Sequence, residues 1–234
     1  MFRWIRGKIK LQNEKNYQHI SGINYPYIVE YLQNLLPEEN AFLTELEKYA
    51  DLNKVPIIEK EVRCMLKTYL EFLKPKTIVE VGTAIGYSAI FFAQYVGDGG
   101  KVISLEKDEK LCTIAQENIK KAGLENKITV ICGDAVETIK TINEPIDLVF
   151  LDANKSKYRH YFDVTYPYLN AGGMFICDNI LYKGMVSNDE LLPRKHRAIV
   201  RALRDFLHFI SHHENLTTSI IPISDGVSVS VKLK

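Results

Sequence analysis

Short runs of β-branched and aliphatic residues alternate with segments of helical periodicity between Thr77 and Cys177. The apolar runs are too short for helices, and glycine, aspartate or asparagine bounds several of them, which is typical of buried strands. The predicted strands cover 78–82, 102–105, 128–132, 147–151 and 173–177. The helices predicted between them cover 87–96, 108–122, about 135–142 and 157–169. This alternation predicts a parallel sheet with helices on both faces.

The two ends of the chain depart from the alternation. Residues 24–50 predict two short helices, and the apolar spacing within 59–73 predicts a third. The last predicted elements are a basic helix and two strands, over 193–210, 218–223 and 227–233. The sequence Ser-Asp-Gly between the last two strands predicts a hairpin turn.

Together these elements predict an α/β fold built on a doubly wound, mostly parallel, seven-stranded sheet of the Rossmann-like kind. An antiparallel C-terminal hairpin closes the sheet, and helices precede it. We assign residues 1–54 to an N-terminal extension with helices and residues 55–234 to the main domain.

Composition narrows the class only in part. A chain of 234 residues can bury the core of one α/β domain. The net charge of +1 neither favours nor excludes nucleic acid, so any RNA contact must come from local patches. No apolar run approaches the roughly 20 residues that span a bilayer, so we expect a cytoplasmic protein without a membrane partner. The basic start, 1–10, favours a solvated terminus over an arm that binds RNA or an anionic surface.

The four cysteines show no C-x-x-C or zinc-ligand spacing. Cys132 and Cys177 lie in apolar strand patterns, where a small buried thiol is the expected form. Nothing in the spacing indicates a disulfide framework.

The first predicted strand ends in the run Glu-Val-Gly-Thr-Ala-Ile-Gly-Tyr-Ser. Gly82 and Gly86 allow the backbone to approach a ligand where a Cβ would collide, and Thr83 and Ser88 add hydroxyls at a helix start. Glu80 stands where the dinucleotide fingerprint has its first glycine. An acid there suits a ligand with an amine or sulfonium cation better than pyrophosphate. Taken alone, the run also fits an ordinary strand–turn–helix.

Two further acids follow the next strands. Glu106 ends the second strand, about 20 residues beyond the glycine turn, where a carboxylate can accept both ribose hydroxyls. Asp134 follows the third strand and is positioned to meet an adenine amino group. A helix-capping acid is the alternative for Glu106, and a plain turn is the alternative for Gly133-Asp134.

The strongest constellation joins Asp152, after the fourth strand, with Asp178 and Asn179, after the fifth. Adjacent parallel strands bring these oxygen ligands to one edge of the sheet, where they suit Mg²⁺, Mn²⁺ or Ca²⁺. The alternative is that each caps a following helix or turn. Lys155 lies three residues after Asp152, and beside a divalent ion its ammonium form is disfavoured. Lys155 is therefore a candidate general base toward a hydroxyl, with a solvated surface lysine as the alternative.

These motifs in combination resemble the cation-dependent class I O-methyltransferases, which include catechol and caffeoyl-CoA O-methyltransferases. The likeness is carried by Glu-Val-Gly-Thr-Ala-Ile-Gly-Tyr-Ser, Leu-Asp-Ala-Asn-Lys, Asp-Asn-Ile-Leu-Tyr-Lys-Gly and Ile-Pro-Ile-Ser-Asp-Gly. It covers most of the chain from about Val55 to the C-terminus. The resemblance implies S-adenosylmethionine (SAM) as methyl donor, Mg²⁺ as metal and a homodimer.

The resemblance also implies roles for individual residues. The methionine part of SAM would contact Glu80, Gly82, Thr83 and Ser88. Glu106 would hold the ribose and Asp134-Ala135 the adenine, with Asp152 and the backbone near Ile57 also touching the cofactor. Asp152, Asp178 and Asn179 would bind Mg²⁺, and Lys155 would act as the base together with Asp152 at the reacting centre.

Within the family, the likeness is greatest to bacterial members that methylate 5-hydroxyuridine at the tRNA wobble position. Val55-Pro-Ile-Ile-Glu-Lys, Lys183-Gly-Met-Val and Pro193-Arg-Lys-His-Arg carry it. The expected product is 5-methoxyuridine. Residues predicted to contact the anticodon loop of tRNA are Tyr182, by stacking, and the cations Lys183, Arg194, Lys195, Arg197, Arg201 and Arg204.

Three alternatives stay open at this stage. The basic helix could instead be a solvated face, although the pattern favours the RNA contact slightly. The same site could serve small catechol-like phenols without RNA. A non-catalytic SAM-binding module is the third possibility, against which the intact set of Asp152, Lys155, Asp178 and Asn179 argues.

Overall fold

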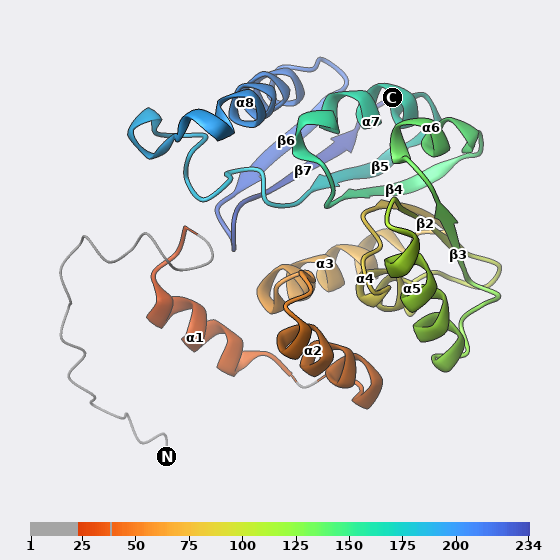
Figure 1. Ribbon diagram of the computed structural model, residues 1–234. Coiled ribbons are helices and arrows are strands. Elements are labelled where there is room, and N and C mark those ends of the chain that lie inside the picture. The colour runs from red at the N-terminus through yellow and green to blue at the C-terminus, as the bar shows by residue number, and fades with distance from the viewer. Residues whose placement is uncertain (1–22, 38) are drawn as a thin grey trace.

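A computed structural model describes residues 23–37 and 39–234, so the basic start of the chain lies outside the described residues. One seven-stranded sheet runs through the molecule in the order β3-β2-β1-β4-β5-β7-β6 (Figure 1). β1 pairs in parallel with β2 and β4, whereas β7 pairs antiparallel with both β5 and β6. The strands are β1 Thr77–Val81, β2 Lys101–Glu106, β3 Ile128–Cys132, β4 Ile146–Leu151, β5 Leu169–Cys177, β6 Leu216–Ile221 and β7 Val227–Lys232. The predicted doubly wound sheet with an antiparallel hairpin is confirmed.

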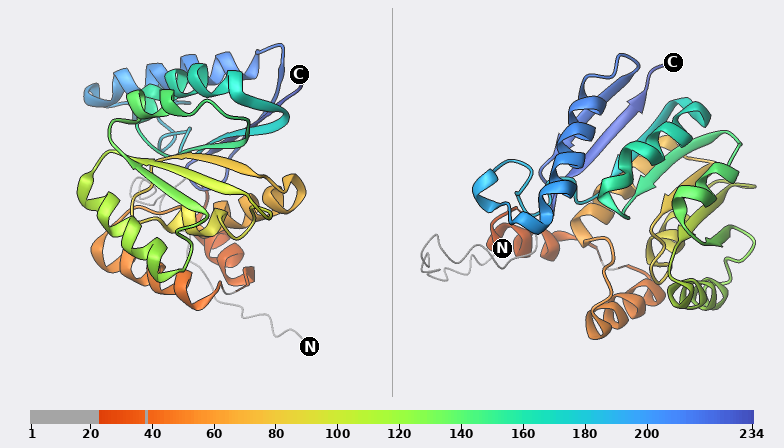
Figure 2. Two further views of the ribbon diagram at one scale, coloured as in Figure 1. Left: turned by 90° about the vertical axis from the view of Figure 1, so that its right-hand side faces the viewer. Right: turned by 45° about the horizontal axis from the view of Figure 1, so that its top comes forward.

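Helices cover both faces of this sheet (Figure 2). α2, α3, α4 and α5 enclose one apolar core against it, and α6, α7 and α8 enclose the other. The helices are α1 Pro26–Leu35, α2 Ala41–Asn53, α3 Lys60–Leu73, α4 Tyr87–Phe92, α5 Glu109–Lys121, α6 Ala135–Thr138, α7 Tyr158–Thr165 and α8 Arg197–Ser211. The three-layer arrangement follows from strands that are apolar on both sides.

The strands differ in burial according to their place in the sheet. All five residues of β1 are buried, and β4 beside it has only Asp147 partly exposed. β3, at one edge, has only Ile128 fully buried and ends in exposed Cys132. The continuous apolar runs therefore form the centre of the sheet, and the weaker run forms its edge.

The helices before the sheet contribute unequally to the core. The side chain of Asn40 accepts a hydrogen bond from the Leu43 amide (2.9 Å) and so caps α2. Leu43, Leu46 and Ala50 of α2 belong to the same apolar cluster as α3 and α4. By contrast, α1 buries none of its residues.

Several predicted boundaries shift for local reasons. α8 begins at Arg197 because a 3-10 turn, Arg194–His196, follows Pro193. β5 begins at Leu169 rather than 173, since a register shift between Ile146 and Leu148 extends its pairing with β4. Within the described part of the chain, no helix combines the length and the apolar character needed to cross a membrane.

The expectation of a buried free thiol at Cys132 is wrong. Cys132 is exposed at the end of the edge strand and forms a disulfide with Cys112 in the first turn of α5. The two residues are 20 positions apart, and only the packing of α5 beside β3 brings them together. Cys177 is a buried free thiol, as predicted.

Candidate active site

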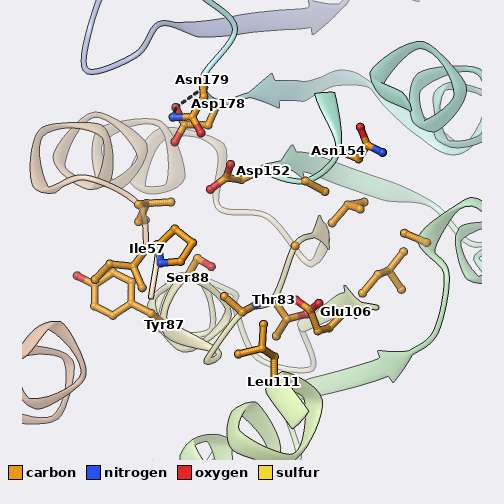
Figure 3. Close-up of a pocket in the computed structure, with 18 of the residues that line it drawn as sticks. Ile57, Thr83, Tyr87, Ser88, Glu106, Leu111, Asp152, Asn154, Asp178 and Asn179 are labelled. Carbon is orange, nitrogen blue, oxygen red and sulfur yellow. Dashed lines mark hydrogen bonds between the residues drawn. The ribbon is translucent and has the colours of Figure 1, made fainter. Parts of the chain in front are cut away.

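A cavity of about 780 Å³ opens where β1, β2, β3, β4 and β5 end. The α2–α3 linker closes its other wall, so that Ile57 and Ser88 lie opposite Asp152 and Asp178 (Figure 3). The residues predicted from the sequence that line it are Ile57, Gly82, Thr83, Ser88, Glu106, Asp134, Ala135, Asp152, Lys155, Asp178 and Asn179. The candidate site thus lies at the carboxyl ends of the parallel strands, where open α/β sheets bind their ligands.

Sheet register aligns the central part of the site. Val81, Leu151 and Cys177 are register partners across β1, β4 and β5. The next residue of each strand is therefore also aligned, and the backbone ladder continues through the Asp152 amide to the Val81 carbonyl (3.0 Å) and the Asp178 amide to the Leu151 carbonyl (2.9 Å). This continuity fixes Gly82 beside Asp152, and Asp152 beside Asp178.

The glycine turn has steric reasons for both of its glycines. Gly82 has φ +106°, and a Cβ there would collide with the carbonyl oxygen of Asp152. Gly86 has φ +84° and precedes the first residue of α4, so a left-handed residue starts the helix. Gly82 therefore needs glycine for the conformation and for the space, and Gly86 needs it for the conformation.

Glu80 lies fully buried behind the cavity wall rather than in it. Its Oε2 accepts a hydrogen bond from Ser104, its register partner in β2, and the Ser104 hydroxyl is also bonded to that of Thr83. Its Oε1 is buried and has no hydrogen-bond partner among the described residues. Burial raises the pKa of Glu80 to about 7, although the Ser104 hydroxyl favours the charged form. An orphaned carboxylate oxygen of this kind fits the amino group of SAM.

Ser104 is a site residue that the sequence interpretation missed. A serine in the middle of an apolar strand carries no motif, and only the β1–β2 register shows that it faces Glu80. Its hydroxyl lies between two predicted cofactor residues, so it orders both.

Glu106, Leu111 and Asp134 form what we call the edge end of the cavity. Glu106 accepts hydrogen bonds from the amides of Ala84 (2.8 Å), Lys107 (2.8 Å) and Asp108 (3.0 Å). Asp134 accepts from the Val136 amide (3.0 Å) and caps α6. Both acids thus perform the turn-capping role held as an alternative, and this also fixes them on the cavity wall where the ribose and adenine roles are predicted.

Asp152, Lys155, Asp178 and Asn179 form the acidic end. The Lys155 ammonium lies 2.9 Å from Asp152 Oδ1 and 3.1 Å from Asn179 Oδ1. Burial, and then the charge of Asp152, raise the pKa of the Asp178 carboxyl well above its ordinary value. Two carboxylates and a carboxamide, of which Asp152 and Asn179 already contact the ammonium, are a donor set that fits a hard divalent cation. No cluster of three or more His, Cys, Asp or Glu with metal-binding geometry occurs among the described residues, since one of the three candidate ligands is an asparagine.

Tyr158 supports the backbone of the acidic end through its hydroxyl group. This residue was not predicted from the sequence. Its buried hydroxyl lies 3.0 Å from the carbonyl oxygen of Asp178 and 3.2 Å from that of Leu151. The tyrosine therefore ties α7 to the ends of β4 and β5. Nothing in its local sequence distinguishes it from an ordinary core tyrosine.

The loop after Asn179 is anchored on the hairpin turn. The Leu181 amide donates to the Asp225 carbonyl (2.9 Å), and the Lys183 amide donates to the Asp225 side chain. The Tyr182 hydroxyl is bonded to His196 Nδ1 (3.0 Å). Asp225, noted in the sequence only as a turn residue, thus positions the segment that carries two predicted substrate residues.

The predicted tRNA residues are not part of the main cavity. Tyr182, Lys183, Arg194 and Lys195 do not line it, and Arg197 lines a second, shallow hollow beside α8 with Arg201 and Arg204. Arg204 donates to the Val186 carbonyl and to Asp189, so it holds a loop. The described cations form a rim near α8 rather than a lining of the site.

Comparison with known proteins places this fold and site. A family model described as O-methyltransferase matches residues 33–233. A caffeoyl-CoA O-methyltransferase of Populus kitakamiensis is 30% identical over 87% of this chain and 91% of its own. A catechol O-methyltransferase of Niastella koreensis is 30% identical over 68% of this chain and 75% of its own. Among solved structures, a candidate caffeoyl-CoA O-methyltransferase from Staphylococcus aureus superposes with a TM-score of 0.82 at 30% identity, covering 88% of this chain and 99% of that one.

The chain belongs to this O-methyltransferase family. It is a SAM-dependent O-methyltransferase of the caffeoyl-CoA and catechol type, which confirms the enzyme class predicted from the sequence. The predicted roles of the individual site residues, and the metal, stay predictions.

Proposed function

We propose that the protein transfers the methyl group of SAM to the 5-hydroxyl of 5-hydroxyuridine at the tRNA wobble position, with Mg²⁺ bound at the acidic end. The observation that carries the chemistry is the contact of Lys155 Nζ with Asp152 and Asn179 at the aligned ends of β4 and β5. A nitrogen base lies here among three hard oxygen ligands, beside the wall assigned to the methyl donor.

Asp152, Asp178 and Asn179 would hold the cation, which lowers the pKa of a bound hydroxyl and orients it. Lys155 contacts the oxygens of Asp152 and Asn179, so its Nζ lies where a hydroxyl bound at this end would release its proton. The amine accepts the hydroxyl proton at Nζ. When bound, SAM would supply the methyl group: the substrate oxygen would form a bond to the methyl carbon as the carbon–sulfur bond breaks, and sulfur would keep the electron pair.

Glu80 and the glycine turn orient the donor in this scheme. The buried Oε1 of Glu80 would accept from the SAM amino group, and Ser104 holds the other carboxylate oxygen in place. Glu106, fixed by three amides, is preorganised to accept the ribose hydroxyls. These contacts position the methyl group and exclude water without taking part in the bond changes.

Exposed cations support tRNA as the acceptor. Lys183, Arg194, Lys195 and Arg197 are exposed on the loop and 3-10 turn that lead into α8. None of them forms an ion pair in the described part of the chain, so they are available to phosphates. Tyr182 lies on the same loop beside His196.

The test is methyl transfer from labelled SAM into bulk tRNA that carries 5-hydroxyuridine, with EDTA, without it, and with Mg²⁺ restored. We expect 5-methoxyuridine in the nucleoside digest only when the metal is present. The second candidate acceptor is a small catechol-like phenol, favoured by the names of the two 30%-identical relatives. Turnover of catechol or caffeoyl-CoA without transfer to tRNA would replace the tRNA proposal by that one.

A homodimer is proposed through α1, whose residues Tyr31 and Leu35 are 63% and 62% exposed. An apolar helix face on a protein of this size is a common contact between identical chains. Sedimentation equilibrium of the wild type and of the Tyr31→Glu, Leu35→Glu double variant tests it. A monomeric wild type contradicts the proposal, and a dimer that the double variant dissociates supports it.

A further inference from the structure

The disulfide between Cys112 and Cys132 has no role in the chemistry derived so far. Cys112 is 2% exposed in the first turn of α5, and Cys132 is exposed at the end of β3, with 6.0 Å between their Cα atoms. The other two cysteines are separate free thiols, Cys64 on α3 and Cys177 on β5. One residue of the pair is therefore exposed, and its partner is buried.

The cross-link lies directly under the edge end of the cavity. Cys132 is the register partner of Glu106, and the next amide, Gly133, donates to the Glu106 carbonyl (2.8 Å). Cys112 Sγ also lies 3.6 Å from that carbonyl oxygen. Leu111, next to Cys112, and Asp134, two residues after Cys132, both line the cavity. The disulfide thus joins the two segments that flank Glu106.

The β3 segment has few other restraints within the sheet. β3 is the edge strand and has only β2 as a neighbour in the sheet. Three of its five residues are partly buried or buried, whereas all residues of β1 are buried. Fixing the end of β3 to α5 therefore restricts a part of the cavity wall that packing holds weakly.

We propose that Cys112 and Cys132 are a reversible thiol–disulfide modification site that adjusts the affinity of the enzyme for SAM. The site responds to low-molecular-weight disulfides such as oxidised glutathione. It adds a control to the donor pocket that is independent of the methyl acceptor.

The exchange balances in two steps. The Cys132 thiolate, having released its proton to water, attacks one sulfur of oxidised glutathione, and a glutathione thiolate leaves. The Cys112 thiolate then attacks the Cys132 sulfur of the mixed disulfide, and the second glutathione thiolate leaves. The two cysteines lose two electrons and two protons, and oxidised glutathione becomes two molecules of the thiol. Cys177 takes no part, since burial raises the pKa of its thiol far above the ordinary value.

The oxidised enzyme is the tighter SAM binder in this proposal. With the cross-link, the end of β3 and the Asp134 turn that follows it are held against α5 before SAM arrives. Without it, SAM binding must order this turn beside Glu106, whose own side chain is already fixed by three amides. Ordering of one or two such side chains corresponds to roughly a threefold to tenfold change in Kd.

The experiment uses the full-length protein incubated in glutathione buffers from fully reducing to fully oxidising. Intact mass after alkylation with N-ethylmaleimide counts the free thiols, and calorimetry gives the Kd for SAM in each buffer. We expect the wild type to lose two alkylatable thiols on oxidation while its Kd decreases roughly threefold to tenfold. Cys132→Ser, at an exposed position, should bind like the reduced wild type in every buffer. Cys64→Ser is the matched control and should keep the full response.

Three results would overturn the proposal: no disulfide in oxidising buffer, equal Kd values in the two states, or a response that persists in Cys132→Ser. Should Cys132→Ser fail to fold by circular dichroism, the comparison of oxidised with reduced wild type decides alone. Because the readout is SAM binding, failure here is distinguishable from failure of the tRNA assay.

Discussion

The acidic end and the edge end of the cavity are built by different means. The acidic end follows the three central strands, β1, β4 and β5, whose register carries directly into Gly82, Asp152 and Asp178. The edge end follows β2 and the exposed strand β3, and it is held by capping hydrogen bonds and one disulfide. The proposed metal and base chemistry, which needs closely held ligands, would thus use the centre of the sheet, and the proposed recognition of the donor's ribose and adenine would use its edge.

The largest effect should come from the acidic end. Asp152→Asn removes the charge that Lys155 contacts and one of two carboxylates predicted to bind the cation. We expect kcat to fall at least about a hundredfold, because both the cation and the base lose their partner. Initial rates at saturating Mg²⁺ measure it. Asp163→Asn, which removes an exposed partner of Arg159 away from the site, is the control. A wild-type rate for Asp152→Asn would show that the carboxylate at the acidic end is not needed for catalysis.

The close packing of Gly82 against the Asp152 carbonyl can be tested through stability, independently of catalysis. Gly82→Ala places a Cβ against the Asp152 carbonyl at φ +106°, so we expect the free energy of unfolding to fall by about 2–4 kcal/mol. Gly99→Ala is the matched control, because Gly99 also has positive φ (+72°) but no neighbour within 4 Å of an added Cβ. It should cost only about 1 kcal/mol. Urea unfolding measures the free energy of unfolding of both variants. An equal loss in the two variants would show that the contact between Gly82 and the Asp152 carbonyl does not constrain residue 82.

How far the sequence predicts this molecule depends on whether a residue's role follows from chain order. Asp152, Asp178 and Asn179 could be predicted because parallel strands end at one edge regardless of exact register. Ser104 and Tyr158 could not, since their partners are set by register and by helix packing that leave no local pattern. The Cys112–Cys132 pair was missed for the same reason: twenty residues separate a helix cysteine from a strand cysteine.

The basic rim beside α8 lies outside both ends of the cavity. Variants of this rim test whether tRNA is the methyl acceptor. Reversing charge at Arg194, Lys195 and Arg197 should weaken tRNA binding about tenfold or more at low salt and leave the Kd for SAM unchanged. Reversal of the three exposed lysines of α5, Lys110, Lys120 and Lys121, on the opposite layer, is the charge-matched control. Filter binding at several salt concentrations measures it. Unchanged tRNA affinity in the rim variant would remove the rim from the interface.

The smallest effect concerns Glu80, which lies between the two ends. Burial raises its pKa to about 7, whereas in the unfolded chain it ionises near its ordinary value of about 4.3. Between these values the folded, SAM-free protein binds more protons than the unfolded chain, so its stability falls as pH rises through this window and then levels off. Binding of the SAM ammonium has the opposite sign, because it needs the carboxylate.

The affinity for SAM should therefore increase up to roughly tenfold between pH 6 and 7.5. In Glu80→Gln, which cannot ionise, this part of the pH dependence should disappear. Ser104→Ala should instead keep a sloping profile and move its midpoint upward, because the charged form loses a donor while the proton site stays. Calorimetric Kd values across this pH range measure all three proteins. A profile in Glu80→Gln as steep as that of the wild type would assign the titration to another group and leave Glu80 as a purely structural acid.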